Sequence, residues 1–303
     1  MKLFVFGLGY AATSAVNQCA PHCRAEDDGW IAATTRNAEK ADRLAACGLR
    51  AHVFDGQTAG NAQMRQDMRE ATHVLISISP GEQDPVLAQH AEDLKASKAL
   101  EWIGYYSTVG VYGDHQGAWV DEAGELRPVS RRSKERVTAE DAWCALANEC
   151  NVPIALLRLA GIYGPGRNGF VNLEAGKARR IVKPGQVFNR IHVADIAAIT
   201  EAMVLRKAQG VFNGADDEPA PPQDVVEYAA NLMGVPVPPD IDYDTANMSP
   251  MGRSFYGETK RVSNKRLFSE LNLQLQYPTY RHAFDALWQN GDWRDVPLLK
   301  KLN

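Results

Sequence analysis

The chain opens with a short apolar run, residues 3–6, that leads directly into the motif Gly-Leu-Gly-Tyr-Ala-Ala beginning at Gly7. This is the G-x-G-x-x-A form of the dinucleotide-binding fingerprint, in the strand-turn-helix context that the fingerprint requires. Gly7 permits a tight turn, Gly9 lets the backbone approach a pyrophosphate, and Ala12 keeps the helix close to the strand. The helix N-terminus offers free N–H groups and a partial positive charge to the phosphates. We therefore expect Gly7, Gly9, Tyr10 and Ala12 to bind a dinucleotide, against the alternative that two glycines at a strand end make an ordinary turn.

Strand-like apolar runs alternate with helix-like segments through the first half of the chain. The runs are too short for helices, and their near-continuous apolarity indicates strands that are buried on both faces of a parallel sheet. They lie at residues 3–6, 30–33, 52–54, 74–78, 102–106 and 154–157, with helices expected from Tyr10, Asn37, Gln63 and Asp84. This alternation predicts an α/β fold with a Rossmann-type doubly wound parallel sheet.

The rhythm of strands and helices weakens after about residue 160. Prolines cluster between Pro219 and Pro250, and the tail carries Trp288 and Trp293. We expect residues 1–160 to form an NAD(P)-binding Rossmann core. Residues 161–303 are expected to form a smaller C-terminal substrate lobe that also returns late strands and helices to the core, without a sharp boundary.

The composition indicates which kinds of binding partner to expect. The 303 residues carry a net charge of −4, which gives no electrostatic reason to expect nucleic acid or an anionic membrane. Five cysteines show no metal-type spacing with histidine, and no apolar run is long enough for a membrane helix. The first 16 residues resemble a short signal peptide, but Gly7 and Gly9 interrupt their apolar stretch. We expect a cytoplasmic protein with a small-molecule substrate and no metal.

The end of the second strand-like run bears on which dinucleotide binds. NAD sites usually place an acidic residue there to hold the ribose hydroxyls. This chain has Thr35 and Arg36 instead, and an arginine can pair bidentately with a 2′-phosphate. We expect NADP to be preferred over NAD, the alternative being that Arg36 is a solvated residue at a helix start. Asp55, after the third run, is expected to reach the adenine amino group, with a surface turn as the alternative.

Further motifs follow along the chain. They are Tyr-Ser-Thr-Val-Gly-Val-Tyr-Gly at residues 106–113, Leu-Arg-Leu-Ala-Gly-Ile-Tyr-Gly-Pro-Gly at 157–166, Asn-Arg-Ile-His-Val-Ala-Asp-Ile-Ala at 189–197, Val-Phe-Asn-Gly at 211–214 and Lys-Arg-Val-Ser-Asn-Lys-Arg-Leu at 260–267. In order and spacing they resemble the extended short-chain dehydrogenase/reductase superfamily, also called the epimerase/dehydratase family. The resemblance implies that Thr108 is the catalytic hydroxyl that orients the substrate beside the nicotinamide, with Ser107 as its neighbour.

The superfamily places a tyrosine and, four residues later, a lysine on the next helix, and this chain departs from that pattern. One alignment puts Arg132 and Arg136 at these two positions, and another puts Ser130 and Lys134 there. Neither supplies a phenol, and arginine stays protonated. The chain therefore most resembles the atypical branch that lacks the pair. Arg136 is expected to bind the cofactor, against the alternative of a solvated helix face.

Four other side chains are candidates for the missing proton donor: Tyr112, Tyr163, His115 and His192. Tyr112 is preferred, because its loop is aimed at the cleft, although such a tyrosine is more often a pocket wall. The sequence thus predicts an NADP-dependent oxidoreductase or epimerase/dehydratase-like enzyme for a small polar substrate that is sugar- or nucleotide-linked. A non-catalytic NADP(H) redox sensor is the alternative. Proteins of the superfamily often form dimers through a helix bundle, so the resemblance is also consistent with a homodimer.

Overall fold

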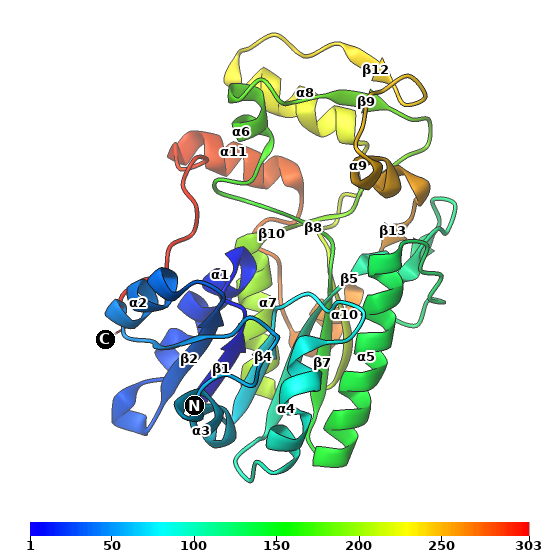
Figure 1. Ribbon diagram of the computed structural model, residues 1–303. Coiled ribbons are helices and arrows are strands. Elements are labelled where there is room, and N and C mark those ends of the chain that lie inside the picture. The colour runs from blue at the N-terminus through cyan, green and yellow to red at the C-terminus, as the bar shows by residue number, and fades with distance from the viewer. Residues whose placement is uncertain (303) are drawn as a thin grey trace.

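A seven-stranded parallel sheet forms the core of the computed structural model, which describes residues 1–302 (Figure 1). In sheet order the strands are β11 (Gly210–Gly214), β7 (Ile154–Leu159), β5 (Trp102–Thr108), β4 (His73–Ile76), β1 (Lys2–Phe6), β2 (Trp30–Thr35) and β3 (Arg50–Val53). The order reverses between β1 and β4, and a doubly wound sheet binds ligands in the crevice outside the carboxyl ends of its strands at such a point. The predicted Rossmann-type sheet is confirmed.

Helices cover both faces of this sheet. One face is covered by α1 (Tyr10–Cys19), α2 (Ala38–Ala46), α7 (Val193–Arg206) and α10 (Lys265–Leu271), and the other by α3 (Ala62–Glu70), α4 (Pro85–Lys95) and α5 (Arg131–Cys150). Successive residues of β1 alternate between the two resulting cores: Leu3 and Val5 belong to the first, and Phe4 and Phe6 to the second. Burial on both faces explains why the strand reads as a continuous apolar run.

Short polar side chains set where the core helices begin. Asn37 accepts the backbone N–H of Lys40 ahead of α2, and Asp84 accepts the N–H groups of Val86 and Leu87 ahead of α4. These N-caps satisfy donors that have no partner inside the helix. The expected helix starts near Asn37 and Asp84 therefore agree with the structure.

The strand boundaries differ from expectation at β3, which begins at Arg50 rather than at residue 52. It is the edge strand of the sheet, where burial on both faces is not required. Arg50 is an exposed residue of this strand, and its guanidinium lies over the Trp30 ring with 4.4 Å between the guanidinium carbon and the ring centroid. An apolar run was consequently a poor guide to where the strand starts.

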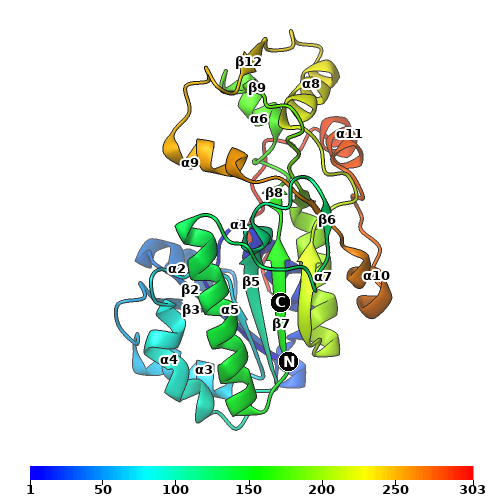
Figure 2. The ribbon, with the colours of Figure 1, turned by 90° about the vertical axis from the view of Figure 1, so that its right-hand side faces the viewer.

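A second lobe lies above the carboxyl end of the sheet (Figures 1 and 2). It contains α6 (Gly169–Glu174), β9 (Arg180–Val182), α8 (Pro222–Met233), β12 (Asp240–Asp242), α9 (Pro250–Ser254), η4 (Phe255–Gly257) and α11 (Tyr280–Asn290). The short parallel pair β8 (Gly161–Tyr163) and β10 (Arg190–His192) lies at the junction. Between these segments the chain returns to the sheet as α7 and β11. A further parallel pair, β6 (Trp119–Val120) with β13 (Arg261–Val262), follows the 3-10 turn η3 (Val109–Tyr112).

No helix within residues 1–302 is both long enough and apolar enough to cross a bilayer.

Candidate functional site

The glycine turn after β1 has the conformation that its residues permit. Gly7 has a φ of +87°, which strains any residue with a side chain, and its N–H donates to Thr34 Oγ1 at 2.8 Å. Gly9 precedes the first turn of α1, and a Cβ built there would meet nothing within 4 Å. Ala12 is fully buried against the sheet. The N-terminus of α1 therefore faces open space without a side-chain cap.

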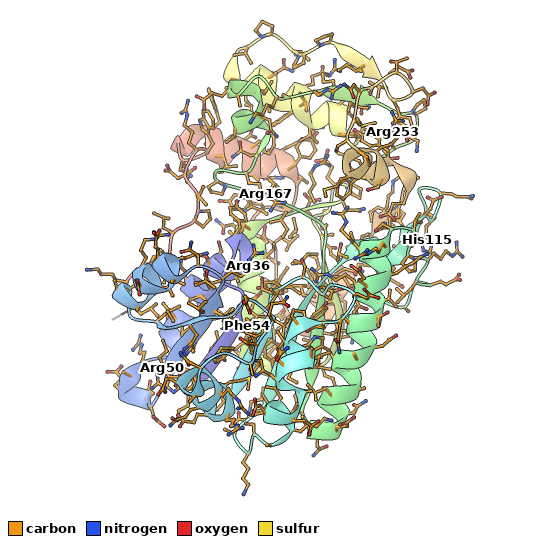
Figure 3. The ribbon with its side chains drawn as sticks, in the orientation of Figure 1. Arg36, Arg50, Phe54, His115, Arg167 and Arg253 are labelled. Atoms are coloured by element: carbon orange, nitrogen blue, oxygen red, sulfur yellow. The ribbon has the colours of Figure 1, made fainter. Side chains whose placement is uncertain are left out.

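The residues expected to contact the adenosine end of a coenzyme follow β2 and β3. Arg36 is exposed at the carboxyl edge of the sheet, and no carboxylate of residues 1–302 lies within 4.0 Å of its guanidinium (Figure 3). Thr35 Oγ1 accepts the N–H of Asn37, and Asp55 Oδ1 accepts the N–H of Gln57 in a tight turn. The side chains of Thr35 and Asp55 thus accept hydrogen bonds within their own turns, whereas the guanidinium of Arg36 has no acidic partner among residues 1–302.

Lys40 adds a second cation to this rim, one that sequence reasoning missed. Its Nζ donates to the carbonyl of Leu8, inside the glycine turn, at 2.5 Å. Partial burial lowers the pKa of its ammonium, with Arg43 as a smaller cause. The signal in the sequence was a lysine one turn into the helix that begins after Arg36.

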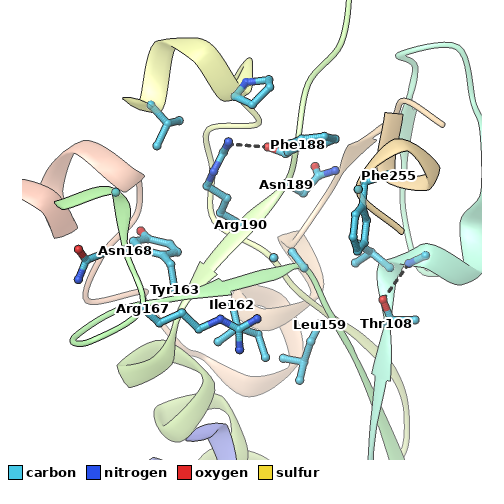
Figure 4. A pocket seen from close by; sticks show the side chains of 18 of the residues that line it. Thr108, Leu159, Ile162, Tyr163, Arg167, Asn168, Phe188, Asn189, Arg190 and Phe255 are labelled. Carbon is cyan, nitrogen blue, oxygen red and sulfur yellow. Dashed lines mark hydrogen bonds between the residues drawn. The ribbon is translucent and has the colours of Figure 1, made fainter. Parts of the chain in front are cut away.

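A cavity of about 1150 Å³ runs from α1 across the carboxyl ends of β5 and β7 into the second lobe (Figure 4). Its wall carries five cationic side chains: Arg136, Arg167, Arg179, Arg190 and Lys260. The wall has one carboxylate, Glu258, whose Oε1 accepts a hydrogen bond from Lys260 Nζ at 2.7 Å. None of the four arginines has a carboxylate of residues 1–302 within 4.0 Å. An excess of unpaired positive charge in a cleft attracts anions.

The two hydroxyls at the end of β5 have different surroundings. Thr108 lies at the cavity surface, and its Oγ1 accepts the N–H of Gly110 at 3.1 Å (Figure 4). Ser107 is buried and donates its hydroxyl to Glu140 Oε1 at 2.5 Å. The Ser107 hydroxyl is therefore already used inside the protein, and Thr108 is the better placed of the two to meet a ligand.

The chain is similar to several known proteins in sequence and in structure. No family model matches its sequence. Protein YeeZ of Escherichia coli strain K12 is 30% identical over 222 residues, 72% of this chain and 74% of that protein. A functionally unknown conserved protein from Silicibacter pomeroyi DSS superposes with a TM-score of 0.84 at 44% identity, covering 96% of this chain and 99% of the other. dTDP-glucose 4,6-dehydratase from Bacillus anthracis, in complex with NAD, superposes with a TM-score of 0.75 at 15% identity, covering 97% and 96%. The chain belongs to the same family as protein YeeZ. It shares the fold of NAD-dependent epimerase/dehydratase structures.

Arg136, which one of the two alignments puts at the superfamily's lysine position, reaches the cavity from α5. Arg136 donates to the carbonyl of Tyr106 and, through Nη2, to Ser79 Oγ at 3.0 Å. It is the only α5 residue of the cavity wall among residues 1–302. Ser130 instead caps the helix by accepting the N–H of Ser133, and Lys134 is exposed. The geometry therefore favours the alignment that puts Arg136 at the lysine position and Arg132 at the tyrosine position.

Arg132 does not replace the superfamily's tyrosine chemically. Its guanidinium carbon lies 5.4 Å from the centroid of the Phe255 ring, which belongs to the second lobe. The contact links α5 to η4 at the edge of the cavity, where Phe255 lines the wall. A guanidinium stays protonated, so this position supplies a cation but no proton donor.

The expected proton donors do not gather around Thr108. The Tyr112 ring is fully buried and lies outside the cavity wall, and its hydroxyl donates to Asn213 Oδ1 at 2.8 Å. His115 approaches the carbonyl of Glu125 in an outer loop. Tyr163 lines the cavity, but burial raises the pKa of its phenol well above the usual range. His192 caps α7, and burial lowers the pKa of its imidazole to about 4.

The second-lobe arginines of the cavity were not predicted from the sequence. Arg190 is the most buried of them, and its Nη1 donates to the carbonyls of Phe188 and Ala220 at 2.9 and 3.1 Å (Figure 4). Arg179 is exposed and donates to the carbonyl of Asn247. The sequence did contain a signal, because Arg190 directly precedes the apolar Ile191. Burying a cation costs free energy, so an arginine in an apolar segment indicates a hydrogen-bonding or binding role.

Proposed function

We propose that the protein is an NADP-dependent oxidoreductase or epimerase/dehydratase-like enzyme that acts on a small anionic substrate, sugar- or nucleotide-linked. The observation that carries the proposal is the continuity of the cavity. Ala11 in the first turn of α1, Thr108 and Arg136 line the same space as Arg179 and Arg190. A coenzyme on the core and an anion in the second lobe would meet at Thr108.

The residues present fit a nicotinamide dinucleotide. The free N–H groups of α1 and the open space over Gly9 suit a pyrophosphate, and Arg136 suits the nicotinamide ribose. The dinucleotide would supply the hydride chemistry. Thr108 would orient a substrate carbonyl or alcohol by a hydrogen bond. The neighbouring dTDP-glucose 4,6-dehydratase and UDP-glucuronic acid 4-epimerase structures hold NAD, which supports this class of coenzyme.

The preference for NADP rests on Arg36 and is tested by Arg36→Ala. A charge-assisted hydrogen bond contributes about 1.5–3 kcal/mol. We therefore expect the affinity for NADP and NADPH to fall roughly 10-fold or more, at about 1.4 kcal/mol per factor of ten, with NAD and NADH unchanged. Calorimetric titration with all four nucleotides measures this. Arg43→Ala is the control, because Arg43 is an exposed cation farther along α2. Equal losses for NAD and NADP would mean that Arg36 acts on the fold.

A non-catalytic NADP(H) sensor is the second candidate, favoured by the arginine at the superfamily's tyrosine position. The two are separated by following NADPH oxidation with a panel of sugar nucleotides, aldehydes and keto acids. The enzyme is expected to turn over an anionic member of the panel and to lose that activity in Thr108→Val with NADPH affinity retained. Tight NADPH binding without turnover of any member, together with coenzyme-dependent capture of a protein partner, would favour the sensor.

A further inference from the structure

A tight turn of the second lobe lies directly against the start of α1. It joins β8 to α6, and the backbones of Gly164 and Arg167 pair across it through two hydrogen bonds of 3.0 Å. Tyr10, the first residue of α1, donates its hydroxyl to the carbonyl of Pro165 at 2.9 Å. The backbone of this turn is therefore held at the dinucleotide end of the cavity, although more than 150 residues separate it from the glycine motif.

The side chain of Arg167 projects from this turn toward the first residue of the helix. Its guanidinium carbon lies 5.9 Å from the centroid of the Tyr10 ring, and the residue lines the cavity (Figures 3 and 4). It is exposed, and no carboxylate of residues 1–302 lies within 4.0 Å of it. By contrast, Arg180 pairs with Glu227 and Asp240, and Arg294 pairs with Glu174.

Two sources of positive potential thus face the same space from different lobes. From the core, α1 presents N–H groups with no side-chain cap and no acidic residue in its first turn. From the second lobe comes the Arg167 guanidinium, and Ala11 and Arg167 line one continuous wall. A diphosphate is the ligand group that matches both, because it accepts from helix N–H groups and pairs bidentately with guanidinium.

We propose that Arg167 is a binding residue for the diphosphate of the coenzyme, supplied by the second lobe. The proposal rests on the proposed dinucleotide site. It assigns to the turn at residues 164–167 a role in coenzyme recognition in addition to connecting β8 with α6. The coenzyme would then be held between the lobes, so its binding would also fix the second lobe over the substrate space.

The test is Arg167→Met, which keeps an apolar stem over Tyr10 and removes the guanidinium. Affinities are measured by calorimetric titration with NADPH, NADH, ADP-ribose and 2′-AMP. The first three carry the diphosphate, and we expect each to bind at least about 10-fold more weakly, since a charge-assisted pair is lost. 2′-AMP has no diphosphate and should bind as it does to the unchanged protein. Arg294→Met is the matched control, because Arg294 is an exposed arginine outside the cavity wall.

The possible outcomes separate this inference from the proposed function. If the unchanged protein binds none of the four compounds, the dinucleotide site itself is wrong. If it binds the three diphosphates and Arg167→Met binds them equally well, the role of Arg167 is refuted. A loss that extends to 2′-AMP and accompanies a lower melting temperature without ligand would show that Arg167 only braces Tyr10, which also refutes it. Arg167→Lys, which keeps the charge but not the bidentate fork, should lose less than Arg167→Met.

Discussion

Arg158 belongs to a buried hydrogen-bond network, and its charge marks that network in the sequence. It interrupts the otherwise apolar strand β7, and its side chain is almost fully buried. Its Nη2 and Nε donate to Glu140 on α5 at 2.6 and 3.1 Å, and Ser107 donates to the same carboxylate. A buried cation needs such a partner, because the protein interior solvates charge poorly. The pair therefore fastens α5 to the sheet directly behind the wall that carries Thr108.

Removing the acid of this pair should destabilise the protein strongly. Glu140→Ala leaves Arg158 buried without a partner, and we expect a loss of about 3–5 kcal/mol in the free energy of unfolding. Urea denaturation measures the loss. Glu135→Ala is the control on the same helix, because Glu135 pairs with the exposed Arg131 and should lose less than about 0.5 kcal/mol. Similar losses for the two variants would show that the buried pair contributes no more than a surface pair.

The sequence predicted those parts of the candidate site whose residues are close together in the chain. The strand, Gly7, Gly9 and the helix after them lie within a few residues, so their geometry follows from local backbone preferences. The contacts of Tyr112 and Arg167, by contrast, could not be predicted from the sequence. Both stand in loops at the carboxyl end of the sheet, but only the fold shows that the Tyr112 ring turns inward to Asn213 while Arg167 lies over Tyr10.

At the scale of helices and strands, the sequence predicted the strands that are buried on both faces of the sheet, because each of them contains a continuous apolar run. The central strands β1, β4, β5 and β7 are almost entirely buried, and each coincides with an expected apolar run. Second-lobe strands such as β9 and β12 are three residues long and partly exposed, so no comparable run marked them. Two large apolar residues of α5, Trp143 and Leu146, are also buried in the core. They are therefore not exposed for the helix-bundle contact of a homodimer.

The start of α7 should contribute to the pH dependence of stability. Burial lowers the pKa of His192 to about 4, while the unfolded residue has an ordinary value near 6.5. Below about pH 6.5 the unfolded chain takes up a proton that the folded chain excludes. The stabilisation is therefore present above that pH and is lost as the pH falls toward 4. Between about pH 7 and about pH 5 this one group should lose roughly 2 kcal/mol.

His192→Asn isolates this contribution. An asparagine can accept the N–H of Ala194 as His192 does, so the helix keeps its cap while the titrating ring is removed. Urea denaturation at about pH 7 and about pH 5 should show a smaller acid-induced loss in His192→Asn than in the unchanged protein. His282→Asn, at an exposed position of α11, should leave the loss as it is. An identical pH dependence in all three proteins would contradict the burial of a neutral imidazole.

At the scale of the whole molecule, the C-terminal tail ties the second lobe back to the core. After α11 the chain descends along the core and ends beside α1 and α2 (Figure 1). Leu302 donates its N–H to the carbonyl of Cys47 at 2.9 Å, and Leu299 and Leu302 pack on the core. The same tail accepts the N–H of Gly166 at the Trp293 carbonyl, at 2.8 Å. The turn that carries Arg167 is therefore braced by a segment whose other end is anchored on the Rossmann core.

Asn17 is the residue through which α1 holds this tail. Its Nδ2 donates to the carbonyl of Leu298 and its Oδ1 accepts the N–H of Lys300, both at 2.9 Å. Asn17→Ala removes both bonds, and at about 1 kcal/mol for each we expect a loss of about 1–2 kcal/mol in the free energy of unfolding. Hydrogen exchange should accelerate at the amides of Lys300 and Leu302, because the tail then opens locally without global unfolding. Gln18→Ala, whose side chain bonds to Glu201 instead, should leave those amides protected. If the tail amides of Asn17→Ala exchange at the unchanged rate, apolar packing of Leu299 and Leu302 suffices to hold the two lobes together.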